Sequence, residues 1–118
     1  MLDWRSNLQD RLGDHRVAGR VHVEGLSCDR GRIIDLSVRG MRLLRRRAWA
    51  PGRKGHVTLM SVGARLTLPA RCVWSRRDGM FAWTVGLAFD GATPEQLRTV
   101  GELALIHAAR LDSRRHAA

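Results

Sequence analysis

The chain has 118 residues, which is enough for one compact domain with a modest core and too few for two. Of its 21 basic residues 20 are arginine, and with 11 acidic residues they give a formal net charge of +10. The hydrophobic fraction of 44% argues against disorder, and the sequence has neither an apolar run of ~18 residues nor the pattern of a signal peptide. We therefore expect a soluble, cytoplasmic protein whose surface attracts anions.

The first predicted element is a short helix over residues 1–13. Trp4, Leu8 and Leu12 recur at helical spacing, and Gly13 ends the pattern. A basic segment from Gly13 to Arg20 then leads into the domain, which we place at residues 14–111. The lead-in is too short to be a domain of its own.

Between Val21 and Phe89 apolar and polar residues alternate as in β-strands, with turn signals between the runs. The sequence Asp78-Gly79 predicts a hairpin turn before the last strand. On that strand one face is expected to carry every second residue, namely Phe81, Trp83, Val85, Leu87 and Phe89. Strands at about 8–12-residue spacing indicate an antiparallel barrel. The six predicted strands lie near residues 21–24, 33–38, 41–44, 56–62, 66–74 and 80–89.

The C-terminal segment changes to helical periodicity. Thr93 is a favourable N-cap, Pro94 suits the first helical position, and Thr93 with Gln96 forms a capping box. An apolar stripe should pack this helix over one end of the barrel, and residues 112–118 are expected to form a flexible tail. The stripe consists of Leu97, Val100, Leu103, Ala104, Ala108 and Leu111.

No motif for catalysis or metal binding is evident. Cys28 and Cys72 belong to no C-x-x-C pair, and the five histidines lack the spacing of metal ligands. The sequence matches neither a nucleophile elbow nor a glycine-rich phosphate loop. We expect a protein that is not an enzyme and uses no metal or cofactor.

Two short motifs combine residue types that suit phosphate and guanine. Arg16 and Arg20 stand four apart just before the first predicted strand. Asp35, Ser37 and Gly40 form the pattern D-x-S-x-x-G between the second and third predicted strands. Because Asp35 and Ser37 are two apart in an extended segment, we expect both side chains on one face. Arginine forks match phosphate oxygens and the O6/N7 edge of guanine, whereas a carboxylate accepts from N–H donors.

The two motifs in this order resemble the PilZ domain, a bacterial receptor module for cyclic di-GMP. The resemblance covers about residues 14–111 and implies a six-stranded antiparallel barrel with a C-terminal helix. It also implies that Arg16 and Arg20 clamp phosphate and guanine, that Asp35 accepts from guanine and that Ser37 adds a hydroxyl. Gly40 would keep the surface clear. The resemblance suggests that ligand binding orders the lead-in and changes the surface offered to a protein partner.

Other interpretations remain open on the residues alone. The arginines can be solvated charges, Asp35 and Ser37 can cap a turn, and Trp74 and Trp83 fit a core better than a ligand platform. The domain can then be a degenerate PilZ-like module that contacts proteins without nucleotide. A basic barrel that binds nucleic acid is the third interpretation, but the chain has no tyrosine and its six aromatic residues fall mostly on apolar faces. The oligomeric state and the number of dinucleotides bound stay open.

Overall fold

A computed structural model describes residues 19–117 of the chain, with side chains as far as residue 108. The helix predicted for residues 1–13 and the side chain of Arg16 therefore lie outside the described residues.

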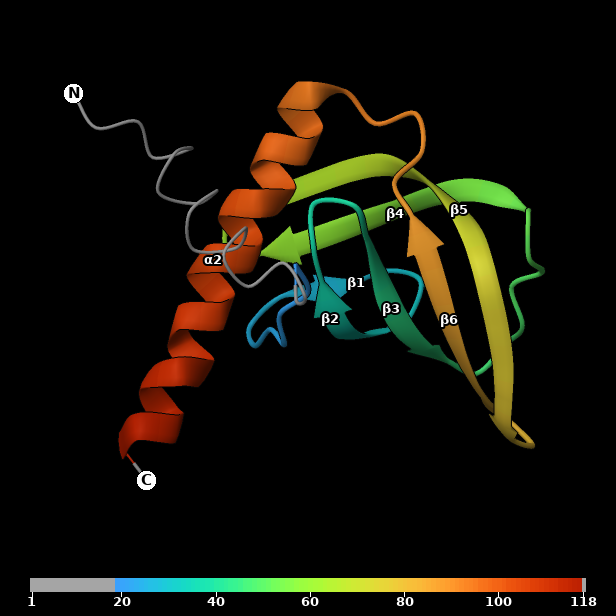
Figure 1. The fold of residues 1–118 in the computed structure, drawn as a ribbon, viewed down its shortest axis with the longest axis horizontal. Helices are drawn as coiled ribbons and strands as arrows, with labels where there is room; N and C mark the ends of the chain where they lie inside the picture. The colour runs from blue at the N-terminus through green and yellow to red at the C-terminus, as the bar shows by residue number, and fades with distance from the viewer. Residues whose placement is uncertain (1–18, 118) are drawn as a thin grey trace.

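Six antiparallel strands form one sheet that curls into a nearly closed barrel (Figure 1). The order across the sheet is β1-β4-β5-β6-β3-β2, so the two edge strands are neighbours in the sequence. A bridge between Cys28 and Gly31 links the ends of these two edges. The predicted six-stranded barrel with a C-terminal helix is confirmed. Its strands are β1 (Ser27–Cys28), β2 (Arg32–Leu36), β3 (Gly40–Arg45), β4 (Lys54–Ser61), β5 (Ala64–Gly79) and β6 (Ala82–Ala88).

The core fills the inside of the barrel and continues under the helix. Alternate residues of β3, β4 and β6 point inward, as the period of two requires, and their aliphatic side chains are almost fully buried. Burial of apolar area on this scale is the main source of stability in a domain of this size. The largest fully buried side chains are Leu36, Met41, Leu43, Leu59, Leu68, Val57, Val85, Val100 and Cys72.

The first strand is not where the alternation predicts it. Val21 makes only an isolated bridge, in which its N–H and C=O each pair with Leu36 at 2.9 Å. Gly25 then adopts a φ of 78°, a left-handed conformation that turns the chain away from β2. The first strand of the sheet is consequently the two-residue β1, which pairs with β4.

The last hairpin turns two residues later than Asp78-Gly79 predicts. Asp78 accepts hydrogen bonds from Arg76 and from the Thr84 hydroxyl, which keep it within the strand pairing. Gly79 pairs with Ala82, so Met80 and Phe81 form the turn. Phe81 is therefore 72% exposed and does not share the buried face of Val85, Leu87 and Phe89, as the alternation had predicted.

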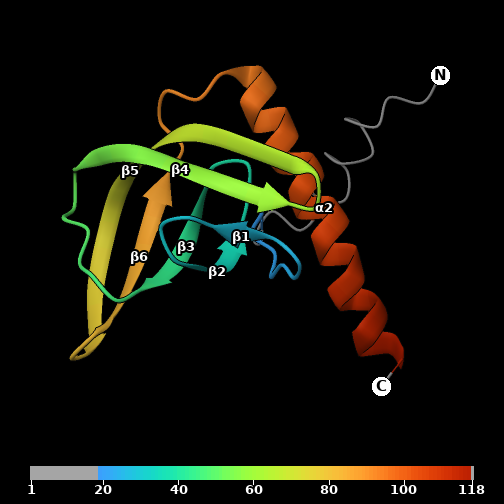
Figure 2. The same ribbon diagram turned by 180° about the vertical axis from the view of Figure 1, so that it is seen from behind.

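Helix α2 (Pro94–Ala117) crosses one side of the barrel (Figure 2). The predicted capping box is confirmed, since the N–H of Thr93 donates to Gln96 Oε1 at 2.9 Å and the N–H of Gln96 donates to Thr93 Oγ1 at 3.1 Å. Val100 and Ala104 are fully buried against the sheet. The helix continues to Ala117, through most of the segment predicted as a flexible tail.

Candidate functional site

The turn between β2 and β3 is built by Ser37. Its N–H donates to the Gly40 carbonyl at 2.9 Å, and its hydroxyl oxygen accepts from the N–H groups of Arg39 at 3.1 Å and Gly40 at 3.2 Å. Ser37 is 5% exposed. Side-chain bonds of this kind fix a tight turn that the backbone alone would leave loose. Ser37 thus lies beyond the end of β2 and holds the turn.

Gly40 stands where two backbones come close together. A Cβ atom at this position would lie 1.9 Å from the Leu87 carbonyl oxygen and 3.0 Å from its carbon. Gly40 pairs with Ala88 at the first register position between β3 and β6. The missing side chain is therefore required for the pairing of these strands, whatever binds above them.

Asp35 is held by an arginine of the neighbouring strand. Arg42 is its register partner and donates to Asp35 Oδ2 from Nε at 2.8 Å and from Nη2 at 2.6 Å. The two side chains lie on the face of the sheet away from the core, because Met41 and Leu43 on either side of Arg42 are buried. The hydrogen bond to Asp35 raises the pKa of Arg42 above its ordinary value.

The second oxygen of this carboxylate has no partner in the part of the chain that the structure describes. Both bonds from Arg42 reach Oδ2, whereas Asp35 Oδ1 is buried and accepts no hydrogen bond from the described residues. A buried oxygen without a partner loses its hydration and gains nothing in return, which typically costs about 1–3 kcal/mol. Asp35 Oδ1 is thus an acceptor that an N–H donor of a ligand would satisfy.

The same register position continues across two more strands. Arg42 pairs with Gly86 on β6, and Gly86 pairs with Trp74 on β5. The indole lies across the glycine, since a Cβ at Gly86 would be 2.2 Å from Trp74 Nε1. A carboxylate, a guanidinium and a half-buried indole therefore lie in one row across the outer face. This row joins hydrogen-bond acceptors, donors and an aromatic ring.

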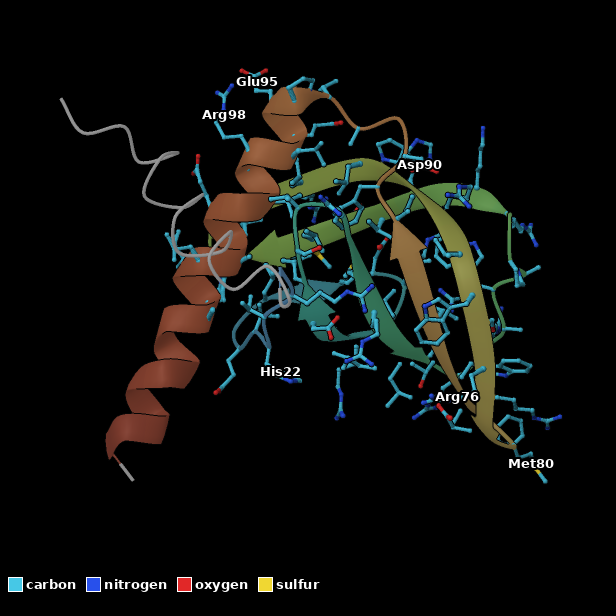
Figure 3. The ribbon with its side chains drawn as sticks, in the orientation of Figure 1. His22, Arg76, Met80, Asp90, Glu95 and Arg98 are labelled. Carbon is cyan, nitrogen blue, oxygen red and sulfur yellow. The ribbon has the colours of Figure 1, made fainter. Side chains whose placement is uncertain are left out.

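Arg20 reaches this end of the barrel through the bridge between Val21 and Leu36. That pairing sets Arg20 opposite Ser37, and the Arg20 side chain is exposed. The following turn of chain is held by His22, whose Nδ1 donates to the Ile34 carbonyl at 2.9 Å (Figure 3). Arg20 thus lies beside Ser37 and Asp35 in the fold, although they come from separate parts of the sequence.

Sequence reasoning named four of the described residues gathered here and gave no binding role to three others. It named Arg20, Asp35, Ser37 and Gly40, whereas it assigned the β5 member of the row to the core and did not single out those on β3 and β6. The sequence did contain a signal for Arg42, since a four-residue turn over 37–40 pairs residue 35 with residue 42. The positions of Trp74 and Gly86 depend on the order of the strands in the sheet, which the sequence does not display. The missed residues are Arg42, Trp74 and Gly86.

The described part of the chain has no arrangement suited to metal or thiol chemistry. It holds no group of three or more His, Cys, Asp or Glu side chains that could bind a metal ion. Burial raises the pKa of both the Cys28 and Cys72 thiols, which keeps them protonated at neutral pH. Within the same residues, none of the helices has the length and apolar character needed to cross a bilayer.

Comparison with known proteins gives a family and two related structures. The family model of the PilZ domain matches residues 9–105. Among curated proteins none matches the sequence significantly. The PilZ domain of YcgR from Escherichia coli, solved with c-di-GMP, has a TM-score of 0.69 and 15% identity over 84% of this chain and 95% of that chain. At that identity the likeness concerns the fold.

The second structure is a pathogenic protein from Xanthomonas campestris, described as a tetrameric PilZ domain self-assembled through a helical bundle. It is 34% identical with a TM-score of 0.51, and the match covers 73% of this chain and 46% of that chain. The present chain thus accounts for less than half of that protein's length.

Proposed function

Because the chain belongs to the PilZ domain family, we propose that it is a receptor for cyclic di-GMP that uses no enzymatic step. The observation that supports this most strongly is the unpartnered Oδ1 of Asp35, at the end of a row that continues through Arg42 to Trp74. Guanine carries adjacent N–H donors on one edge, and a buried carboxylate oxygen is the acceptor they need. The same site offers arginines for the phosphates.

Each part of the ligand has a matching group in this proposal. Asp35 Oδ1 accepts from a guanine N–H, and the Trp74 ring stacks on a guanine plane. Arg20, with Arg16 four residues earlier, donates to phosphate oxygens. Charge-assisted hydrogen bonds contribute roughly 1.5–3 kcal/mol each, so four of them support micromolar affinity, about −8 kcal/mol, after ordering costs.

Signalling follows from where the arginines lie in the chain. Arg20 precedes the bridge that anchors Val21 to β2, so residues 13–20 are the segment that a bound dinucleotide would hold against the outer face. Fixing this segment changes the surface that a protein partner meets. In this proposal the protein acts in the bacterial cytoplasm as a module that passes ligand occupancy to that partner.

Titration calorimetry with cyclic di-GMP tests the proposal directly. We expect a micromolar dissociation constant at stated salt and a rise in melting temperature with ligand. Absence of heat at high micromolar concentrations, for protein that melts cooperatively, would overturn it. The domain would then be a PilZ fold that serves as a protein-interaction module without nucleotide.

Arg20→Ala is expected to weaken binding of cyclic di-GMP at least tenfold, about 1.4 kcal/mol, because a charge-assisted bond to phosphate is lost. The melting temperature should change little, since the Arg20 side chain is exposed and forms no ion pair with a carboxylate of residues 19–108. Arg16→Ala should weaken binding of cyclic di-GMP to a similar extent in calorimetry. Arg65→Ala removes an exposed arginine elsewhere and is the matched control. A fall in melting temperature that tracks the loss of affinity would assign these arginines to the fold.

We also propose that the protein self-associates through α2, as the Xanthomonas relative does through a helical bundle. The supporting observation is that the C-terminal half of this helix extends beyond the barrel (Figures 1 and 2), while Ile106 on it is 59% exposed. An exposed aliphatic side chain on a protruding helix suits a helix–helix contact.

Light scattering after gel filtration tests the self-association. We expect the wild-type protein to run as an oligomer and Ile106→Glu to run as a monomer with an unchanged melting temperature. Val62→Glu, at a residue that is 99% exposed in the turn between β4 and β5, is the control and should leave the assembly intact. A monomeric wild type at 100 µM would refute the proposal.

A further inference from the structure

A second basic surface lies at the opposite end of β2 and β3 from the turn at Ser37. Five arginines contribute to it from the start of β2 and from the end of β3 with the residues beyond it. We call this surface the arginine basin. No ion pair with a described carboxylate is recorded for any of its five arginines. Its arginines are Arg30, Arg32, Arg45, Arg46 and Arg47.

Arg45 is fixed in place before any ligand arrives. Its Nη1 donates to the Arg30 carbonyl at 2.8 Å, and its Nε donates to the Arg47 carbonyl at 3.1 Å. The guanidinium lies 5.1 Å from the centroid of the buried Trp49 ring, and the guanidinium of Arg30 lies 5.6 Å from the same centroid. Burial, and secondarily the charge of Arg30, lower the pKa of Arg45. The guanidinium groups of Arg30 and Arg45 are like charges held close together, so they produce a positive potential that attracts an anion.

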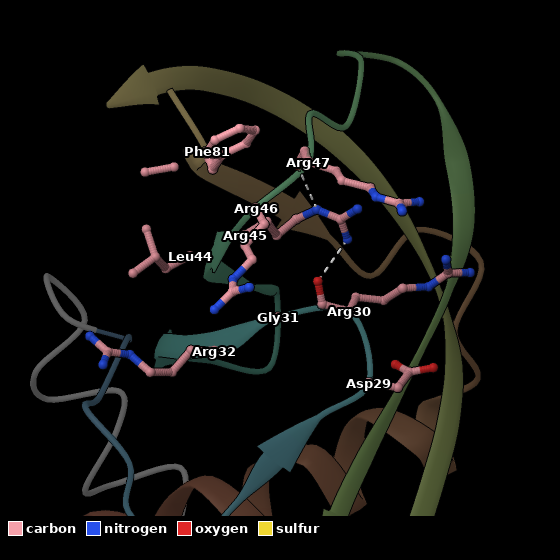
Figure 4. A pocket seen from close by; sticks show the side chains of 10 residues that line it. Asp29, Arg30, Gly31, Arg32, Leu44, Arg45, Arg46, Arg47 and Phe81 are labelled. Atoms are coloured by element: carbon pink, nitrogen blue, oxygen red, sulfur yellow. Dashed lines mark hydrogen bonds between the residues drawn. The ribbon is translucent and has the colours of Figure 1, made fainter. Parts of the chain in front are cut away.

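The single carboxylate that lines the basin, Asp29, is hydrogen-bonded to a neighbouring strand. Asp29 Oδ1 accepts from the N–H of Thr58 at 2.8 Å, which ties the start of the loop to β4. Asp29 makes no ion pair with these arginines, so in the described part of the chain one carboxylate stands against five guanidinium groups in the lining. The basin is concave, with a volume of about 620 Å³, and Figure 4 shows the arginine side chains around it. That size falls in the usual range of sites for small ligands.

An exposed aromatic ring stands at the rim of the basin. Phe81, at the tip of the hairpin between β5 and β6, lines the hollow and is 72% exposed (Figure 4). The sequence had placed this residue on a buried face, and that placement was part of the case against nucleotide stacking. An exposed phenyl ring that lines the same hollow as the arginines offers the two contacts a nucleotide needs, a base platform and phosphate donors.

We propose that the arginine basin is a second ligand site, which binds a nucleoside di- or triphosphate. The arginines bind the phosphate chain, and the base lies against Phe81. Planar guanidinium groups pair with two oxygens at a time, so adjacent phosphates suit a cluster of arginines better than a lone carboxylate does. The hollow is bounded on one side by a hairpin, so it suits a single nucleotide. A nucleic acid strand would need a continuous groove that extends past the site.

The basin is separate from the row at Asp35. The hairpin register sets Arg32 opposite Leu44 at one end, and Asp35 opposite Arg42 nearer the turn. The basin extends from Arg32 away from that turn, toward the hairpin of β5 and β6. Occupancy of one site can therefore be measured while the other is filled or disabled.

The experiment titrates ATP, GTP, inorganic tripolyphosphate and a dT oligonucleotide into the full chain in 150 mM salt. We expect ATP or GTP to bind with a dissociation constant of about 100 µM or tighter, which two or three charge-assisted bonds can supply. Arg46→Glu should weaken this binding at least tenfold, and Arg65→Glu, which makes the same charge change at an exposed residue outside the basin, should not. Because both side chains are exposed, neither substitution should alter the melting temperature.

Phe81→Ala separates the base from the phosphates. It should weaken nucleotide binding about fivefold or more through lost stacking, and leave tripolyphosphate unchanged. Equal affinity for tripolyphosphate and ATP would overturn the base contact. Oligonucleotide binding without nucleotide binding, or nucleotide binding that Arg46→Glu leaves intact, would overturn the site.

The outcome is independent of the proposed receptor function. Asp35→Ala should leave nucleotide binding to the basin intact, and saturating cyclic di-GMP should not compete with it. A protein that binds ATP without cyclic di-GMP would refute the receptor function alone. Competition between the two ligands would refute the separate site.

Discussion

Replacing Asp35 with alanine is expected to weaken the binding of cyclic di-GMP at least 100-fold, about 2.7 kcal/mol. The substitution removes the buried Oδ1 acceptor, and it also frees Arg42 from the oxygen that holds it in the row. Arg42 is one-third exposed at its side chain, so it can turn to solvent and limit the cost to the fold. Calorimetry well below the melting temperature measures the effect.

Two companion variants show whether that loss comes from the acceptor. Asp35→Asn keeps a carbonyl oxygen of similar shape and should retain part of the affinity, because that oxygen can still accept from a guanine N–H. Asp90→Ala breaks a comparable pair with Arg71, on the surface beside β5 and β6, and should leave binding unchanged. If Asp35→Ala binds as well as the wild type, the carboxylate serves only to pair with Arg42.

Gly40→Ala is expected to destabilise the fold by about 3 kcal/mol or more, with a fall in melting temperature of roughly 15 °C. The added methyl would lie 1.9 Å from the Leu87 carbonyl oxygen, and both clashing atoms are backbone atoms of β6 that no rotamer change can move. The strands would have to separate where β3 and β6 begin to pair. Thermal or urea unfolding followed by circular dichroism gives the measurement.

The control for this prediction is Gly79→Ala. A Cβ at Gly79 would meet only the Ala82 Cβ at 3.6 Å, an ordinary contact, so the stability should stay nearly constant. The motif alone suggests that Gly40 clears space for a ligand. A Gly40→Ala variant that unfolds like the wild type but loses the dinucleotide would support that interpretation over strand pairing.

Local chemistry was sufficient to predict much of the site. The turn at Ser37 depends on hydrogen bonds within four residues, and the capping box of Thr93 and Gln96 depends on contacts of the same range. Short-range bonds of this kind are set by residue type and spacing, which the sequence displays. The alternation of the last predicted strand similarly placed Val85 and Leu87 on one face, and both are buried.

Predictions failed where the position of a turn decided the outcome. Val21 lies in an alternating run but pairs only at a single bridge, because the chain leaves β2 at Gly25. Phe81 lies in phase with Val85, but the bonds to Asp78 moved the turn and brought the ring to the tip. In each case the alternation was compatible with a longer strand, and it does not show at which residue the chain turns.

The composition of the chain, and its arginine content above all, determined by itself that the protein carries a large positive charge, which attracts anions. The spacing of the strands likewise predicted a barrel, and the two motifs predicted a site near the turn over residues 37–40. Only the tertiary structure separated the charges into different places, with Arg42 neutralised by Asp35 and Arg45 held beside Arg30 over Trp49. The physical reason is that charge is a property of single residues, whereas its compensation depends on which strands lie side by side.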